Sequence, residues 1–319
     1  MSNTSRILIT GGAGFIGSSL ADKLLTLGHQ VIVFDNFNDY YDPAIKRTNI
    51  KQALQNQNYK LYEGDIEKIE DLEKVFSENK IEAIVHLAAR AGVRPSIEAP
   101  LAYAMTNIIG TINILEMMKK YGIKRMSMAS SSSVYGNCQA TKFSEDLNIR
   151  EPISPYAATK SADEQICYTY HYLYGFEIYM LRFFTVFGPR QRPDLAINKF
   201  VDLIMADKPI DMYGDGSTMR DYTYIDDIVD GIISSLNYHQ TGYEIFNLGG
   251  GSPVTLKEMI ATIEEVLGKK AAVNQLPMQP GDVNKTISDI TKAQNLLGYQ
   301  PKTSFKEGIQ KFIMWKKSC

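Results

Sequence analysis

The sequence predicts an α/β protein in which a doubly wound parallel sheet is joined to a smaller C-terminal α/β lobe. Three observations support this prediction. Short apolar runs alternate with segments of helical spacing at βαβ intervals. A glycine-rich turn follows the first apolar run, where a helix is expected to begin. The chain has 319 residues, which is more than one typical core requires, so a second lobe is expected.

The first part of the chain supplies the large sheet and its helices. Short apolar runs bounded by turn residues are typical of buried strands, and apolar residues three or four positions apart are typical of helices. The expected strands cover residues 6–10, 30–35, 59–65, 82–89, 124–131 and 176–183. The expected helices cover residues 17–29, 70–79, 105–122 and 158–175, with a further polar helical segment before the third strand.

The pattern changes after Phe187, where loop-like stretches become frequent. These stretches are "GPRQRPD", "YGDGSTMRDYTY" and "LPMQPGDV", and the helical segments "LKEMIATIEEVLG" and "FKEGIQKFIMW" lie between them. We therefore expect a first domain over residues 1–187, to which residues 222–248 return. The second lobe is expected to contain residues 188–221 and 249–319.

Composition excludes several classes of function. The formal net charge is −2, so the chain has no basic field that would hold nucleic acid or an anionic membrane. The 3 cysteines show neither a disulfide framework nor the spacing of a zinc site, and no metal is expected. No signal-peptide pattern precedes the first strand, and no apolar run approaches the length of a membrane span. These features predict a cytoplasmic protein.

Gly11, Gly14 and Gly17 form a G-x-x-G-x-x-G motif between a predicted strand and a predicted helix. Such a turn lets a phosphate approach the backbone at the N-terminus of the helix. The second strand ends in Asp35, whose carboxylate can accept hydrogen bonds from both hydroxyls of an adenosine ribose and would repel a 2′-phosphate. The motif therefore predicts a dinucleotide site that favours NAD over NADP. The alternative is a tightly packed turn without a ligand.

Further cofactor contacts are expected where other strands end, because ligands of such folds lie at the carboxyl ends of the strands. Asp65 follows the third strand, although an ordinary turn aspartate is the competing interpretation. The complete set of residues predicted to contact the cofactor is Gly11, Gly14, Phe15, Ile16, Gly17, Asp35, Asn36, Asp65, Ile66, Leu87, Ala88, Ala89, Tyr156 and Lys160.

Tyr156 and Lys160 are the candidate catalytic pair. Pro155 is a plausible first residue of a helix, and positions i and i+4 share one helix face. A free tyrosine has a pKa of about 10, and a nearby ammonium group favours its phenolate form. Tyr156 can then act as a base near neutral pH. A tyrosine and a lysine at this spacing are common by themselves, but here the glycine turn and a serine cluster, Ser130 to Ser133, precede them.

The sequence resembles the extended short-chain dehydrogenase/reductase family, and within it the nucleotide-sugar 4-epimerases. The resemblance is carried by "TGGAGFIG", "HLAA", "SSSSVYG", "SPYAATK", "RFFTVFGPRQRPD", "MRDYTYIDDIVDGI", "FNLGGG" and "PGDV". It implies a bound NAD that takes hydride from C4 of the sugar and returns it to the other face. Tyr156 would take the proton of the 4-hydroxyl, Ser131 would bond the same oxygen, and Lys160 would bind the nicotinamide ribose and tune Tyr156.

Ser132 and Ser133 favour epimerisation over related reactions. In the 4,6-dehydratases that this sequence resembles, Asp-Glu stands at these two positions, and in the related decarboxylases the second position is Glu. Serine is a poor general acid or base, which argues for simple epimerisation. The alternative is that both serines only form hydrogen bonds around the end of the strand.

The resemblance also implies where the substrate binds. Arg220 matches an arginine that clamps the diphosphate, and Asp282 matches a residue that bonds the uridine ribose. The weaker candidates near the phosphates and the base are Asn198, Lys199 and Tyr213, for which a surface or packing role is the alternative.

Thr185, Arg192 and Arg94 occur in segments that resemble the UDP-glucuronate 4-epimerases, and these side chains can bond or balance a sugar carboxylate. We therefore expect interconversion of UDP-glucuronate and UDP-galacturonate. The alternatives are a UDP-glucose/UDP-galactose or N-acetylhexosamine 4-epimerase and, in another class, a non-catalytic NAD-binding regulator. The resemblance further implies a homodimer, in which helices near Thr106–Tyr121 and Tyr156–Tyr174 of two chains form a four-helix bundle.

Overall fold

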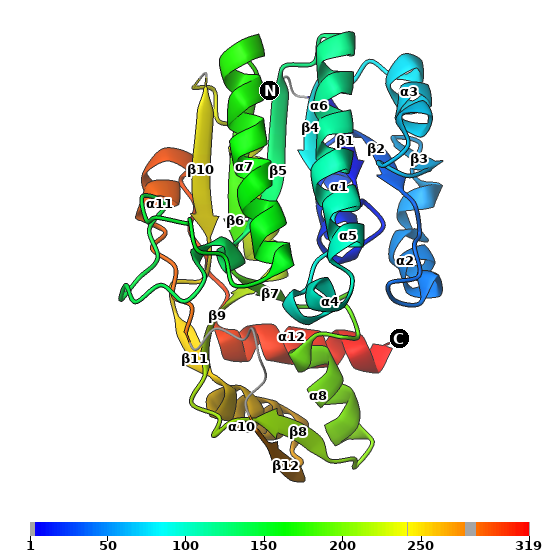
Figure 1. The fold of residues 1–319 in the computed structure, drawn as a ribbon. Coiled ribbons are helices and arrows are strands. Elements are labelled where there is room, and N and C mark those ends of the chain that lie inside the picture. The colour runs from blue at the N-terminus through cyan, green and yellow to red at the C-terminus, as the bar shows by residue number, and fades with distance from the viewer. Residues whose placement is uncertain (1–3, 241, 278–284, 319) are drawn as a thin grey trace.

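A seven-stranded parallel sheet forms the centre of the molecule in the computed structural model, which describes residues 4–240, 242–277 and 285–318 (Figure 1). The strand order is β10-β6-β5-β4-β1-β2-β3. The order reverses between β1 and β4, as in a doubly wound Rossmann-type sheet, so the predicted fold class is confirmed. The strands are β1 (Arg6–Thr10), β2 (Gln30–Asp35), β3 (Tyr59–Glu63), β4 (Ala83–His86), β5 (Arg125–Ser131), β6 (Glu177–Phe183) and β10 (Tyr243–Leu248).

Helices cover both faces of this sheet. Side chains alternate along each strand, so in β1 Ile7 and Ile9 join one apolar core and Leu8 joins the other. One core is shared with α1 (Phe15–Thr26), α2 (Pro43–Ile50) and α9 (Ile225–Leu236). The other core is shared with α3 (Ile69–Glu78), α6 (Gly110–Tyr121) and α7 (Pro155–Tyr174).

Local signals set the ends of the two long helices. Ser154 caps the start of α7 through its side chain, and Pro155 occupies the first turn. Gly122 and Gly175 end α6 and α7 in the left-handed conformation that glycine adopts easily. The expected helix 105–122 differs at its start, because Ala104–Ile109 form a π-helical segment before α6. The helices α4 (Val93–Glu98) and α5 (Pro100–Tyr103) and the short turns Ala53–Gln55 and Ser132–Tyr135 were not predicted from the sequence.

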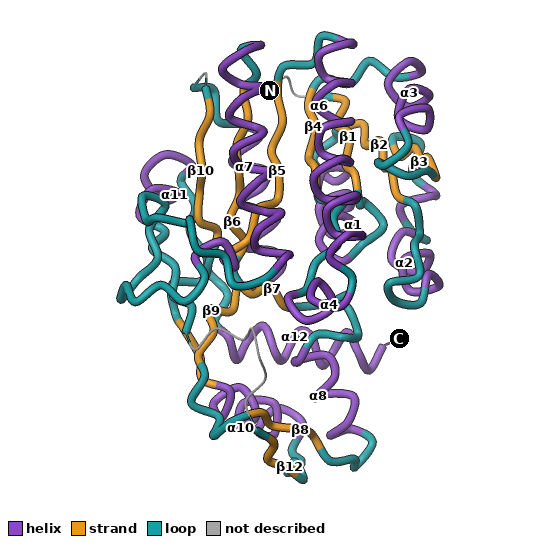
Figure 2. The backbone as a smooth tube through the Cα atoms, viewed as in Figure 1, coloured by secondary structure: helices purple, strands orange, loops and turns teal. Residues whose placement is uncertain are grey.

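The C-terminal lobe lies beyond the carboxyl ends of the strands (Figure 2). Its strands are β7 (Thr185–Phe187), β9 (Met219–Tyr224) and β11 (Pro253–Thr255), which pair in one sheet, and β8 (Ile210–Tyr213) and β12 (Val273–Leu276), which pair in another. Its helices are α8 (Ala196–Met205), α10 (Leu256–Leu267) and α12 (Phe305–Ser318), whereas α11 (Thr291–Leu297) packs against β10 and α9 of the large sheet. None of the helices within the described ranges is long and apolar enough to cross a membrane.

The expectation of a loop throughout "YGDGSTMRDYTY" is wrong in its second half, which forms β9. The charged residues Arg220 and Asp221 interrupt the apolar pattern that would indicate a strand. In the structure, β9 pairs with β7 on one side and β11 on the other. These ladders satisfy its backbone groups, which decides the conformation. Strand β10 belongs to the large sheet, and the division of the chain into two lobes stays a prediction.

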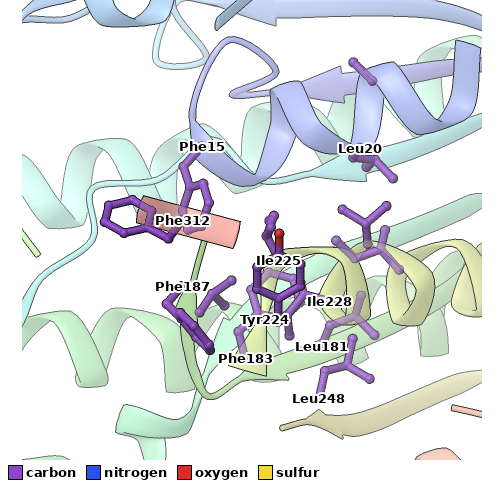
Figure 3. Packing of buried hydrophobic residues seen from close by; sticks show 14 of the residues in the cluster. Phe15, Leu20, Leu181, Phe183, Phe187, Tyr224, Ile225, Ile228, Leu248 and Phe312 are labelled. Carbon is purple, nitrogen blue, oxygen red and sulfur yellow. The ribbon is translucent and has the colours of Figure 1, made fainter. Parts of the chain in front are cut away.

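One apolar core continues from the large sheet into the second lobe. Phe15 at the start of α1 belongs to the same buried cluster as Phe187, Tyr224 and Phe312, which come from β7, β9 and α12 (Figure 3). This shared core fixes the lobe against the carboxyl edge of the sheet. The edge and the lobe therefore form the two walls of the site described next.

Candidate active site

A pocket lies at the carboxyl edge of the sheet, between the first strands and the second lobe. It opens where β1 and β4 are neighbours, which is the point where ligands of such sheets bind. The residues predicted from sequence that line it are Gly11, Gly14, Phe15, Ile16, Gly17, Asp35, Asn36, Ile66, Leu87, Ala88, Ala89, Ser131, Ser132, Ser133, Tyr156, Lys160, Thr185, Arg192 and Arg220.

The glycine turn leaves no room for side chains. Gly11 has a φ of +68°, and a Cβ there would lie 2.8 Å from the backbone nitrogen of Ala88. Gly14 precedes α1 without any side-chain cap, so the N–H groups at the start of the helix face the pocket. This cradle fits the pyrophosphate of a dinucleotide, which is also attracted by the helix dipole.

Asp35 is held more firmly than the sequence suggests. Its Oδ1 accepts hydrogen bonds from Lys46 Nζ at 3.1 Å and from the backbone N–H of Phe37 at 2.9 Å. Its Oδ2 accepts one from the backbone N–H of Ala13 at 3.1 Å. Both Asp35 and Lys46 are buried, and both line the pocket. The carboxylate is therefore pre-oriented at the end of β2, with a lysine beside it that the sequence analysis missed.

Tyr156 and Lys160 lie on one face of α7, as the i,i+4 spacing predicts, and both line the pocket. The ring of Tyr156 packs edge-on against Tyr103, with 6.1 Å between the ring centroids. Lys160 is buried, and its Nζ donates to the carbonyl oxygen of Ala129 at 3.0 Å and to Asp163 Oδ2 at 3.3 Å. Helix α7 therefore presents a phenol and an ammonium group side by side to a common ligand space.

The serine cluster reaches the same space from β5. Ser131 is the last residue of β5, and a short turn, Ser132–Tyr135, follows it. The Oγ of Ser131 accepts hydrogen bonds from the backbone N–H of Ser133 at 3.2 Å and from the Ser133 hydroxyl at 2.9 Å. This turn folds three consecutive hydroxyl side chains into the pocket wall. The hydroxyl proton of Ser131 is left for a ligand oxygen.

Three predicted substrate residues line the part of the pocket formed by the second lobe: Thr185, Arg192 and Arg220. Arg192 donates from Nε and Nη2 to the carboxylate of Asp194 at 2.9 and 2.8 Å, and from Nη2 to the carbonyl oxygen of Ala91 at 3.4 Å. Its guanidinium lies 5.2 Å from the centre of the Tyr40 ring. Within the described part of the chain, Nη1 makes no hydrogen bond, so this group can serve a ligand in the pocket.

Other predicted residues lie outside the pocket lining. Asp65 accepts a hydrogen bond from Asn36 Nδ2 at 2.9 Å, so it supports a residue that lines the pocket. Arg94 on α4 is exposed and stacks over Tyr213 of β8 at 4.9 Å. This contact joins the two lobes at the rim.

The remaining weaker candidates take part in local contacts of α8 or are not placed. The side chain of Asn198 is buried, donates to the carbonyl oxygen of Gln191 at 2.5 Å and accepts from Lys316 Nζ at 2.7 Å. Lys199 is exposed on α8. Asp282 lies outside the described residues. For Asn198, the packing alternative is the one that these contacts favour.

Several pocket residues were not anticipated: Asn38, Tyr40, Tyr41, Lys46, Ile153, Leu195 and Thr286. Four of them belong to the stretch "NDYYDPAIK" directly after β2. A signal in the sequence could have revealed them. Two adjacent tyrosines and a lysine follow the second strand, at whose end a ligand is expected to bind.

Comparisons with known proteins show the family to which this chain belongs. Residues 8–312 match the family model described as GDP-mannose 4,6 dehydratase. A UDP-glucuronate 4-epimerase from Thermodesulfobacterium geofontis is 45% identical over 97% of this chain and 95% of its own. The chain belongs to the extended short-chain dehydrogenase/reductase family.

Solved structures of this family match nearly the whole fold. The structure of UDP-glucuronic acid 4-epimerase from Bacillus cereus, in complex with UDP-glucuronic acid and NAD, has a TM-score of 0.92 at 37% identity and covers 98% of this chain and 99% of its own. That of UDP-glucose 4-epimerase from Thermotoga maritima, with UDP-glucose, has a TM-score of 0.90 at 34% identity over 98% of this chain and 99% of its own. Similarity to relatives of both kinds places this chain among the nucleotide-sugar enzymes of the family.

Proposed function

We propose that the protein is an NAD-dependent 4-epimerase of a UDP-sugar, with UDP-glucuronate and UDP-galacturonate as its substrate and product. The observation that carries this proposal is the convergence of Tyr156, Lys160 and Ser131 on one pocket whose other end is the glycine turn. The bound NAD would accept a hydride from the sugar and return it. Hydroxyl side chains at Ser132 and Ser133, in place of acids, favour epimerisation over dehydration.

Each residue then has a defined task. Tyr156 removes the proton from the 4-hydroxyl of the sugar and later gives it back. The Ser131 hydroxyl donates to the same oxygen and holds it in place. Lys160 carries a positive charge beside Tyr156, which favours the phenolate. Because Lys160 is buried, little water screens this interaction.

The pocket fits NAD from end to end. The cradle at Gly11 and Gly14 suits the pyrophosphate, and the carboxylate of Asp35 suits the hydroxyls of the adenosine ribose. Asp35 repels a 2′-phosphate, while the ammonium group of Lys46 offsets part of that repulsion. We therefore expect a preference for NAD that is smaller than Asp35 alone would give.

A uronate substrate is favoured by the donors at the sugar end of the pocket. Thr185 and Arg192 come from the second lobe and line the same pocket as the serine turn. Neutral hydroxyls can bond the carboxylate of the sugar, and the guanidinium of Arg192 can balance its charge. The same donors also suit a diphosphate, so a UDP-glucose 4-epimerase is the alternative.

Substrate preference is the direct test of this proposal. We expect kcat/KM for UDP-glucuronate to exceed that for UDP-glucose by tenfold or more, which corresponds to about 1.4 kcal/mol in transition-state binding. The variant Arg192→Leu should lower the ratio of the two values by about tenfold, because it removes the charge that balances the carboxylate. Both values are measured on the same preparation, with product analysis by chromatography.

Arg190→Leu is the matched control, because Arg190 lies in the same loop but pairs with Asp22 at 2.7 Å, outside the pocket lining. It should leave the ratio unchanged. A tenfold preference for UDP-glucose would reject the uronate substrate and favour the galactose-type enzyme. A transient rise of absorbance in the NADH band on adding either sugar argues against a non-catalytic regulator.

We further propose a homodimer formed through α6 and α7, which lie side by side on one face of the sheet (Figure 1). Leu101 is 80% exposed and Tyr172 is 77% exposed, which is unusual for such large apolar groups. Other exposed apolar side chains of α7 and the segment before α6 are Met105, Ile109, Tyr168 and Leu173. Pairing these helices about a two-fold axis would bury them in a four-helix bundle.

Light scattering at micromolar concentration should give about twice the chain mass of 35.8 kDa. Replacing Leu101 and Tyr172 together by lysine should shift the mass toward that of the single chain, because like charges would meet across the axis. A single-chain mass for the unmodified protein would reject the dimer.

A cytoplasmic location is also part of the proposal, supported by the free thiols of Cys138 and Cys167.

A further inference from the structure

The proposed reaction leaves one buried acid beside the site without a role. Asp163 on α7 has 0% exposure, and its Oδ2 lies 3.3 Å from Nζ of Lys160. A buried carboxylate is costly unless it is paired, so its position next to the lysine of the catalytic pair calls for a physical reason.

The other charged and titratable groups around Asp163 have partners of their own or lie in the apolar core. Glu164, the next residue of α7, binds Arg182 of β6 at 2.8 and 2.9 Å and accepts a hydrogen bond from Ser130. On β4, His86 lies between the hydroxyls of Thr10 and Thr111, at 2.6 and 3.1 Å. Cys167, one turn further along α7, is fully buried and points into the apolar core.

These groups leave Lys160 as the ionic partner of Asp163. Burial lowers the pKa of His86 to about 3, and the positive charge of Lys160 acts in the same direction, so the imidazole is neutral. Burial raises the pKa of the Cys167 thiol, so this group is also neutral. Burial likewise raises the pKa of Asp163 to about 6, against the opposing effect of Lys160. The Asp163 carboxyl is therefore mainly ionised at neutral pH and can take up a proton in a mildly acidic solution.

The geometry divides the three N–H groups of Lys160 between protein and pocket. One donates to the carbonyl oxygen of Ala129 on β5 and one to Asp163. Lys160 also lines the pocket, and its third N–H is left for a ligand. Asp163 therefore fixes the direction of the lysine and also offsets part of the positive charge that Tyr156 experiences.

We propose that Asp163 is a positioning residue that anchors Lys160 and sets the pH at which Tyr156 becomes an active base. This inference rests on the proposed function, because it assigns Tyr156 the role of base. Ionised Asp163 opposes the phenolate of Tyr156, and protonation of Asp163 in acid removes this opposition. In a plot of kcat/KM against pH, the rise on the acid side is then shallower than a single ionisation would give.

The test replaces Asp163 by asparagine, which keeps an oxygen that accepts from Lys160 but removes the negative charge. Seven residues of helix span about 10 Å, and two charges at that separation with an effective dielectric constant of about 20 shift an ionisation by about one pH unit. The acid limb of kcat/KM should therefore move to lower pH by about one unit in Asp163→Asn. The difference from the unmodified enzyme should fade below about pH 6, where Asp163 itself takes up a proton.

A second readout needs no turnover. The absorbance of tyrosinate is titrated in the NAD-loaded protein, with Tyr156→Phe as the blank in both backgrounds, and Asp163→Asn should lower the midpoint of the Tyr156 signal by the same amount. If no UDP-sugar turns over, the proposed function fails, but this titration still decides the role of Asp163. Should Asp163→Asn not fold, Asp163→Ser is smaller, also accepts a hydrogen bond and allows the same measurement.

Asp227→Asn is the matched control. Asp227 is also buried, but it accepts from the backbone N–H groups of Lys302 and Thr303 at 2.9 and 3.1 Å, and none of these residues lines the pocket. This variant should lose stability without moving the acid limb or the midpoint. If the limb and the midpoint stay in place in folded Asp163→Asn or Asp163→Ser, Asp163 only packs beside Lys160 and the proposal is wrong.

Discussion

Turnover is expected to fall by about 10²–10⁴-fold when Tyr156 is replaced by phenylalanine, because general-base catalysis contributes about that much. The ring remains, so its edge-on packing against Tyr103 and the start of α7 should be preserved. The affinity for NAD, measured by calorimetry, should therefore change little. The loss should appear in kcat with little change in KM, since the phenol acts in the transition state.

Tyr103→Phe is the control for this experiment. It removes a hydroxyl from the ring that packs on Tyr156 but lies outside the pocket lining, so turnover should stay within a few-fold of normal. A Tyr156→Phe enzyme with a nearly normal rate would show that another group acts as the base. The reaction assigned to this pocket would then need a different proton acceptor.

Replacing Arg182 by methionine is expected to destabilise the protein by about 3–5 kcal/mol, because it leaves the carboxylate of Glu164 buried without its partner. The pair is bidentate, with both side chains less than 4% exposed. The same guanidinium also donates to the hydroxyl of Tyr135 at 2.9 Å, which in turn donates to Asn247 on β10 at 2.7 Å. The substitution therefore removes the hydrogen bonds that join α7, β6 and β10.

Urea unfolding of the variants measures this effect. Changing Glu164 to leucine in the Arg182→Met background should recover part of the lost stability, since no charge is then left unpaired. Arg47→Met removes an exposed pair with Glu63 and should cost about 1 kcal/mol or less. A loss of similar size in Arg182→Met and Arg47→Met would mean that water screens the buried pair.

Local sequence patterns predicted much of the fold and several of the side chains that line the pocket. The glycine spacing from Gly11 to Gly17 predicts a tight turn, because a residue without a Cβ adopts the positive φ found at Gly11 easily. The spacing of Tyr156 and Lys160 places both on one face of any helix. Apolar runs of strand length, separated by helical periodicity, predict a parallel sheet, because each helix returns the chain to the edge of the sheet where the previous strand began. All these signals act within a few residues of one another along the chain.

Contacts between distant segments decided the rest. The lysine beside Asp35 comes from α2, and the acid beside Lys160 is notable only because the fold buries it completely. Strand β9 was not predicted, because its backbone pairs with β7 and β11 and the carboxylate of Asp221 accepts hydrogen bonds from the backbone N–H groups of Gly250, Gly251 and Ser288. By itself, the sequence therefore determined the sheet, the glycine turn and the side chains that we propose as catalytic. Only the tertiary structure decided which charges meet, because burial and partners set the energy of a charge and neither is a property of the local sequence.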